Sequence, residues 1–334
     1  MAAYTTIDNP ELYFQADLYT GNGSNNHAQT FDGDENMQPN MVWIKSRSAA
    51  ENHHIFDSVR GANKRLIAND NGAEFDDSSN LQSFDSDGFT LGTADGINQN
   101  TTTFVAWCWK ESATAGFDIV TYSGTGSAQT VSHSLSAVPH AFWCRERDNG
   151  GDGWAVYHKN NTSAPATDFL PLHDTEGTRD SDTRFNDTAP TSSVFTVASD
   201  TSTNNNGSAY VAHLWTGKQG FSRLESYIGI EDADGAYFHL GFRPAWLLIK
   251  DASSDGKNWH IYDNKRLGYN VDNNMSRANL NSADQTDDDI DLLANGFKIR
   301  RNTSALCDSG ETLVYWAIAE APFVNSNGVP ANAR

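Results

Sequence analysis

The chain has 334 residues and a formal net charge of -20, because 43 acidic residues outnumber 23 basic ones. Nucleic acids bind proteins through clustered cations, so this balance excludes nucleic acid as a partner and disfavours an anionic membrane surface. Aromatic residues make up 11% of the chain and can fill sizeable cores. With 26 glycines among many Asn, Asp, Ser and Thr residues, the composition favours an all-β fold with frequent turns.

The cysteines and the N-terminus bear on the cellular setting. Cys108, Cys144 and Cys307 are odd in number and widely spaced, which predicts buried free thiols and argues against disulfides or a zinc site. The first residues lack the basic and apolar regions of a signal peptide. The longest apolar run, 313–319, is far shorter than the ~20 residues of a membrane-spanning helix. We therefore expect a protein made in a cytoplasm, with no membrane as a partner.

An internal repeat runs through the chain. A tyrosine-turn-glycine landmark begins at Tyr19 and Tyr122 and recurs in a worn form at Tyr227, at offsets of 103 and 105 residues. A second landmark consists of a proline, an apolar run and a cation, and occupies residues 39–45, 139–145 and 244–250. Three further landmarks keep the same order and occupy residues 53–57, 154–158 and 259–263; 87–91, 193–197 and 295–299; and 104–109, 210–215 and 315–320. Five landmarks at nearly equal spacing predict a triplicated protein.

The repeat defines the expected domain organisation. It predicts three modules over residues 14–111, 117–217 and 221–322. An N-terminal arm (1–13) precedes them and a polar C-terminal tail (323–334) follows them. Because the links between the modules are only a few residues long, we expect the modules to pack side by side.

Within each module, seven or eight short strand candidates are separated by clusters of turn residues, which is typical of a sandwich or barrel. In the first module they cover residues 15–19, 27–31, 41–45, 54–57, 64–67, 89–91 and 103–109. The uniformly apolar run 41–44 predicts an inner strand buried on both faces. Ala106, Ala212 and Ala317 are expected to hold equivalent places beside bulky aromatics. A closed array of three modules fits this pattern, whereas propeller blades are about half as long.

The residues predict no catalytic site, no metal site and no cofactor. Acidic-glycine loops at 32–35, 85–88 and 231–235 could offer oxygens to calcium, but none completes a twelve-residue calcium loop, and turns require the same residue types. His53 and His54 are adjacent, so in a strand they face opposite ways and cannot chelate together. No nucleophile motif occurs, and no pair of carboxylates stands out for glycoside cleavage.

Two tryptophans are the candidate binding residues. Trp154 and Trp259 hold matching places in the second and third modules, each after a loop rich in Gly, Asn and Asp. Exposed tryptophans stack on sugar rings, so both are candidates for carbohydrate binding. Core packing is the favoured reading for each of them.

The landmarks at 19–23, 39–45, 84–89 and 105–108 resemble those of a family of tandem-repeat virion proteins, tail-fibre-like or appendage-like, of marine bacteriophages including cyanophages. The resemblance covers nearly the whole chain. It implies an all-β protein of three tandem lectin-like, jelly-roll type β-sandwich modules of about 100 residues each, with a structural role and no catalytic residues. The third module departs most, at 227–230, so a binding loop there is expected to be lost.

We therefore expect a structural protein of a bacteriophage virion, assembled in the host cytoplasm. A tail fibre or knob-like appendage and a capsid decoration protein both fit, with other virion proteins as partners and a homo-oligomeric state. The alternative is a carbohydrate-binding module that recognises host surface glycans for attachment, through Trp154 and Trp259. A glycan-degrading enzyme is the third and least supported class.

Overall fold

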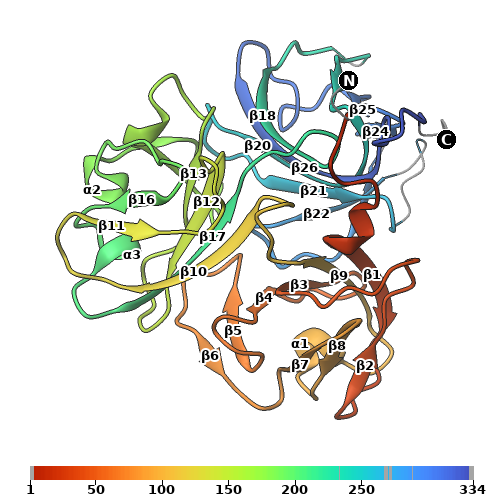
Figure 1. Ribbon diagram of the computed structural model, residues 1–334, viewed down its shortest axis with the longest axis horizontal. Coiled ribbons are helices and arrows are strands. Elements are labelled where there is room, and N and C mark those ends of the chain that lie inside the picture. The colour runs from red at the N-terminus through yellow and green to blue at the C-terminus, as the bar shows by residue number, and fades with distance from the viewer. Residues whose placement is uncertain (1–3, 233, 267–269, 271–272, 288, 331–334) are drawn as a thin grey trace.

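The computed structural model describes residues 4–232, 234–266, 270, 273–287 and 289–330 of the chain. Three lobes surround a common centre (Figure 1). We call them unit 1 (β1 to β9), unit 2 (β10 to β17) and unit 3 (β18 to β26). The expected all-β sandwich fold is confirmed, and the strands of the three units fall inside the three predicted modules.

The elements follow the same order in the three units. Unit 1 is preceded by a short 3-10 helix, η1 (Pro10–Leu12), and consists of β1 (Phe14–Thr20), β2 (His27–Gln29), β3 (Met41–Ser46), β4 (His53–Asp57), β5 (Lys64–Ile67), β6 (Phe75–Asp76), β7 (Leu81–Asp85), β8 (Gly88–Leu91), α1 (Asp95–Asn98) and β9 (Thr103–Trp109). Unit 2 consists of β10 (Phe117–Ser123), β11 (Gln129–Ser132), β12 (Ala141–Glu146), β13 (Ala155–His158), η2 (Pro165–Thr167), β14 (Asp168–Pro171), β15 (Arg179–Asp180), α2 (Asp182–Phe185), β16 (Val194–Val197), α3 (Thr201–Asn204) and β17 (Ala209–Trp215). Unit 3 consists of β18 (Ser222–Ile228), β19 (Tyr237–His239), β20 (Phe242–Asp251), β21 (Trp259–Asp263), β22 (Asn273–Arg277), β23 (Gln285–Asp287), β24 (Ile290–Leu293), β25 (Gly296–Ile299) and β26 (Thr312–Pro322).

Each unit has one large and one small antiparallel sheet. The large sheets have the strand orders β1-β9-β3-β4-β5-β6, β10-β17-β12-β13-β14-β15 and β18-β26-β20-β21-β22-β23, which are equivalent in the three units. The small sheets are β2-β8-β7, β11-β16 and β19-β25-β24. The helices are single turns, and none of those in the described residues is long and apolar enough to cross a membrane.

Both faces of a large sheet are buried. On β3, Val42 and Ile44 pack with Phe89 of the small sheet, forming the sandwich core of unit 1. The alternate residues Met41 and Trp43 point the other way and join a second core that is shared with the other units. This double burial explains the uniformly apolar sequence of β3 and confirms its prediction as an inner strand.

The shared core holds every tryptophan of the chain. Its nine tryptophans are Trp43, Trp107, Trp109, Trp143, Trp154, Trp215, Trp246, Trp259 and Trp316. The rings of Trp43, Trp143 and Trp246, one from each unit, meet there, with the Trp43 centroid 5.6 Å from that of Trp143 and 6.4 Å from that of Trp246. The three units are therefore held together by one continuous apolar centre.

The strand register corrects the alignment of the third copy. Ala106 and Ala212 each pair with the residue before the cation of their own landmark, but the residue that pairs with Ile249 in unit 3 is Tyr315. Ala317 lies two residues further along β26, so its expected equivalence is wrong. Side chains alternate with a period of two along a strand, so a shift of two residues preserves the apolar pattern and escapes detection in the sequence.

The tyrosine landmark has the same role in all three units. Each tyrosine hydroxyl donates to a main-chain carbonyl oxygen near the turn that precedes the last strand of its unit. The pairs are Tyr19 with Ile97 at 2.7 Å, Tyr122 with Thr203 at 2.7 Å and Tyr227 with Leu306 at 2.8 Å. The third copy therefore keeps this structural contact even though its sequence around the tyrosine has diverged.

The N-terminal arm and the C-terminal tail are tied to unit 3. Tyr4 donates through its hydroxyl to the Gly241 carbonyl at 2.8 Å, and Thr5 Oγ1 donates to the Gln219 carbonyl in the link between units 2 and 3 at 2.9 Å. Asp8 accepts from the Ser326 backbone at 2.6 Å. The arm thus fastens the link between two units.

The glycine of the landmark is required by a close backbone contact. A Cβ atom at Gly124 would lie 2.0 Å from the Asn205 carbonyl oxygen, and the equivalent glycines of the other units are equally tight. We predict that Gly124→Ala lowers the free energy of unfolding by about 1–3 kcal/mol, because the backbone must move to admit the methyl group. Urea denaturation measures the change. Gly72→Ala, where the nearest atom would lie at 3.7 Å, serves as the control and should leave the midpoint nearly unchanged.

Candidate functional site

The two tryptophans proposed as sugar-binding residues are buried. Trp154 and Trp259 are 1% and 0% exposed, and both lie in the shared core. The Trp154 indole N–H donates to the Ile67 carbonyl of unit 1 at 2.8 Å, and the Trp259 indole N–H donates to the Pro171 carbonyl of unit 2 at 2.9 Å. Their expected role in stacking on glycans is therefore wrong, and the favoured reading as core residues is right.

These two contacts belong to a closed cycle between the units. In unit 1 the equivalent residue is His53, whose imidazole faces the backbone of Arg277 in unit 3. Burial lowers the pKa of His53 well below its usual value, and the nearby Arg277 backbone opposes this effect. The neutral imidazole accepts the Trp43 indole N–H at 3.0 Å. Unit 1 thus contacts unit 3, unit 3 contacts unit 2, and unit 2 contacts unit 1.

A second cycle links the ends of the neighbouring strands. Asp57 Oδ2 in unit 1 lies 3.0 Å from His213 Nε2 in unit 2. Asp263 Oδ2 in unit 3 accepts the Trp107 indole N–H of unit 1 at 2.9 Å. The residue in the same place in unit 2 is His158, whose ring packs 4.6 Å from that of Trp316 in unit 3. All six residues are buried.

The two buried carboxylates each have their own arginine. Arg60 follows Asp57 by three residues, as Arg266 follows Asp263. Each arginine donates a hydrogen bond through Nε to its aspartate. Each also donates through Nη2 to a main-chain carbonyl in the strand that carries the aspartate. Burial opposes ionisation of Asp57, but the charge of Arg60 and the hydrogen bond from His213 outweigh it and hold the pKa below its usual value. In unit 2, Asn161 takes the place of the arginine, so no cation is left without a carboxylate.

A third cycle is formed by the cation that ends the proline landmark in every copy. Lys45 Nζ lies 3.4 Å from the Asn281 carbonyl oxygen, and Lys250 Nζ lies 3.1 Å from that of Thr175. Arg145 Nη2 donates to the carbonyl of Gly72 in unit 1. Each cation is fully buried and reaches a carbonyl of a neighbouring unit. Burial lowers the pKa of both lysines to about 8 and that of Arg145 to about 10.

Two sequence patterns mark the residues of these contacts, but the patterns do not show that the residues are buried. The apolar run ends in Lys45, Arg145 or Lys250, and the Asp-x-x-Arg pattern occurs at 57–60 and 263–266. A cation or carboxylate after an apolar strand normally lies at the surface, and only the contact between units places these groups in the interior.

The remaining candidate residues have structural surroundings. The three cysteines are free and buried, as predicted, and burial raises the pKa of Cys144 to about 12, so this thiol is protonated and unreactive. In the acidic-glycine loops, Asp85 accepts from Ser83 and Thr90, which is a turn interaction. Among the described residues, no three His, Cys, Asp or Glu side chains are grouped so that they could hold a metal ion.

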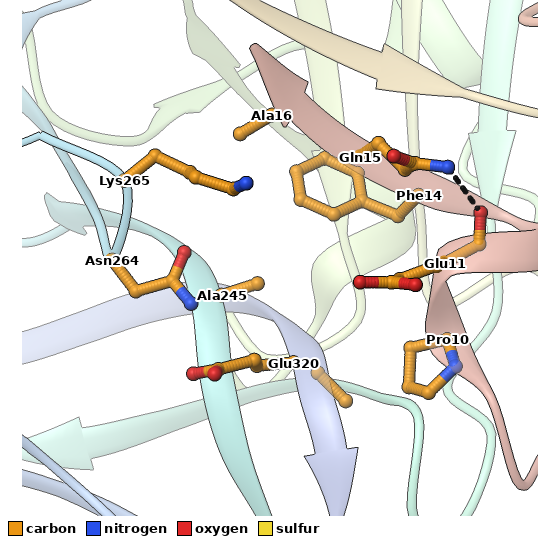
Figure 2. Close-up of a pocket in the computed structure, with 10 residues that line it drawn as sticks. Pro10, Glu11, Phe14, Gln15, Ala16, Ala245, Asn264, Lys265 and Glu320 are labelled. Atoms are coloured by element: carbon orange, nitrogen blue, oxygen red, sulfur yellow. Dashed lines mark hydrogen bonds between the residues drawn. The ribbon is translucent and has the colours of Figure 1, made fainter. Parts of the chain in front are cut away.

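A small cavity of about 40 Å³ lies at the seam between units 1 and 3 (Figure 2). Figure 2 shows the Lys265 side chain of unit 3 pointing toward Phe14 at the start of unit 1. The Lys265 ammonium group is paired with Asp32 at 2.6 Å. Since a water molecule takes about 30 Å³, the cavity can hold little more than solvent and is best described as part of the seam.

We predict that Asp57→Asn lowers the free energy of unfolding by about 3 kcal/mol, because it leaves the buried Arg60 guanidinium without its nearest carboxylate. The exposed pair of Lys265 and Asp32 is the matched comparison, and Lys265→Met should cost less than about 1 kcal/mol. Urea denaturation at neutral pH measures both. Equal losses of unfolding free energy in the two variants would contradict the view that the buried ion pair stabilises the protein more than the exposed one.

A pH dependence follows from the buried Lys250. Its pKa of about 8 in the folded protein lies below the usual 10.5, so the unfolded chain binds more protons between these values and stability increases with pH there. The stability of the wild-type protein relative to Lys250→Met should therefore rise by about 2 kcal/mol from pH 8 to pH 10. Urea titrations at several pH values test this. A difference that stays constant between pH 8 and pH 10 would contradict the prediction.

Comparison with known proteins places the chain in one family. The matching family model is described as "Domain of unknown function (DUF7483)" and covers residues 9–322, so it spans all three units and the helix η1. A search of curated proteins finds no match. The chain belongs to the DUF7483 domain family.

Proposed function

We propose that the protein is a structural component of a bacteriophage virion that works by protein–protein assembly. A tail fibre or knob-like appendage and a capsid decoration protein are the two forms of this role. The proposal is carried by one observation, namely that three equivalent sheets are joined through buried contacts into one body. Such a body suits a mechanical part, because no unit can separate without exposing the tryptophan core.

The positions of the buried tryptophans and histidines support the same structural role. Trp154 and Trp259 pack between units, and His53, His158 and His213 take part in the cycles described above. These contacts join one unit to another, which suits a structural role. The net charge of -20 favours solubility before assembly. The partners in this proposal are other virion proteins and further copies of the same chain.

Recognition of a host surface glycan is the second candidate function. It loses the two tryptophans on which it was first based. A polar cavity on the outer side of unit 2 is the observation that keeps it as a proposal.

Immunogold labelling of intact particles tests the structural role. Antibodies against the folded protein should label purified virions from an infected culture, at one defined place on the particle. Disrupted particles probed on a blot serve as the control for the presence of the protein. A signal in the lysate without any in purified particles would rule out the proposal.

A further inference from the structure

Unit 2 contains a polar cavity of about 200 Å³ next to Trp154. The residues that matter for its chemistry are Asp152, His173, Asp174, Glu176, Arg184 and Ser202. Pockets for drug-sized ligands run from roughly 300 to 1,000 Å³, so this one has room for a small molecule only. The Trp154 ring points into the shared core, whereas Gly153 and Ala155 lie on the opposite face of the strand.

The cavity exists because unit 2 lacks an asparagine pair that the other units have. In unit 1, Asn69 accepts the backbone N–H of His53 at 2.8 Å and donates to Asn52 at 2.8 Å. Asn279 and Asn258 repeat this arrangement in unit 3, at 2.9 and 2.8 Å. The pair fills the space in front of the strand and satisfies its first N–H group.

In unit 2 the pair is replaced by Gly153 and His173. His173 Nδ1 still accepts the Trp154 backbone N–H, at 3.2 Å. A Cβ atom at Gly153 would lie 1.7 Å from the imidazole, so the glycine is needed once the histidine is present. The two replacements are therefore coupled. Together they remove both amide side chains, and the His173 imidazole fills the place of only one of them.

A third replacement removes a large side chain near the same space. His54 in unit 1 and His260 in unit 3 are buried at the place that Ala155 takes in unit 2. In unit 1 the ring of His54 lies against Gly96 of α1. The residue in that helical place in unit 2 is Ser202, which lines the cavity. Two side chains that fill the other units are thus absent on one face of this strand.

The lining offers both donors and acceptors, with three carboxylates beside one arginine and one histidine. Asp152, Asp174 and Glu176 are acceptors, and Glu176 is paired with Arg179 at 3.3 Å. Arg184 is a donor whose guanidinium carbon lies 3.4 Å from the centre of the Phe169 ring. Since His173 Nδ1 accepts a hydrogen bond, its Nε2 carries the proton of the neutral ring and is a second donor. Such a mixture matches the hydroxyl groups of a polyol, each of which donates and accepts.

We propose that the cavity of unit 2 binds one ring of a neutral sugar through hydrogen bonds from its polar lining. This inference rests on the second proposed function, glycan recognition, and is independent of the assembly role. The carboxylates accept from adjacent hydroxyls, while Arg184 and His173 donate to sugar oxygens. Units 1 and 3 lack the site because their asparagine pairs and buried histidines occupy the space.

Saturation-transfer NMR and calorimetry with the whole protein test this inference, using glucose, galactose, mannose and N-acetylglucosamine as probes. At least one sugar should bind with a one-to-one stoichiometry and a dissociation constant on the order of 1 mM or tighter. The double variant Gly153→Asn/His173→Asn restores the asparagine pair and should weaken binding at least tenfold. If the double variant does not fold, Asp174→Asn provides a second test. It leaves the cavity open and should also weaken sugar binding, because it removes one acceptor.

Asp76→Asn, at an exposed carboxylate outside the cavity, is the matched control for Asp174→Asn and should bind sugar like the wild type. Sugar binding that survives in the filled variant would overturn the site while leaving glycan recognition intact. Binding of putrescine in preference to every sugar would overturn the ligand class. Absence of any binding, to these sugars and to a broad glycan array, would overturn both the site and the second proposed function.

Discussion

Burial of both faces of each large sheet is the constraint from which the rest of the structure follows. The small sheet of a unit covers one face, where Val42 and Ile44 lie, but Trp43 on the other face can be covered only by the neighbouring units. An isolated unit would expose a large aromatic surface to water. The three units therefore share one core, and the family model spans all three of them.

The polar cycles give this core its geometry. Burying Lys45, Arg145 or Lys250 costs solvation energy, and each cation recovers part of it from carbonyl oxygens of a neighbouring unit. Dispersion forces alone would allow the three sheets to slide past one another. Directed hydrogen bonds from fixed places in each copy favour one relative position, as buried polar groups do in other assemblies with a unique register.

The copies have diverged through coupled replacements. Where unit 2 has His158 in place of a buried aspartate, Asn161 replaces the arginine that would otherwise be unpaired. Where it has Gly153, His173 replaces the asparagine partner, because either change alone leaves a clash or a gap. Such pairs preserve the shared core while they change the lining of a cavity in one unit.

The residues alone determined the all-β class and the inner strand at Met41 to Ile44, and they predicted a threefold repeat, because local patterns of apolar residues and turns are visible in the sequence. They did not reveal the two-residue shift at Ala317, since alternation is unchanged by such a shift. They suggested exposure for Trp154 and Trp259 as one alternative, and only the packing of one unit against the next shows that these rings are interior. The same holds for the buried cations and for the cavity at Gly153, because both depend on which surfaces meet, and that is decided by the tertiary structure.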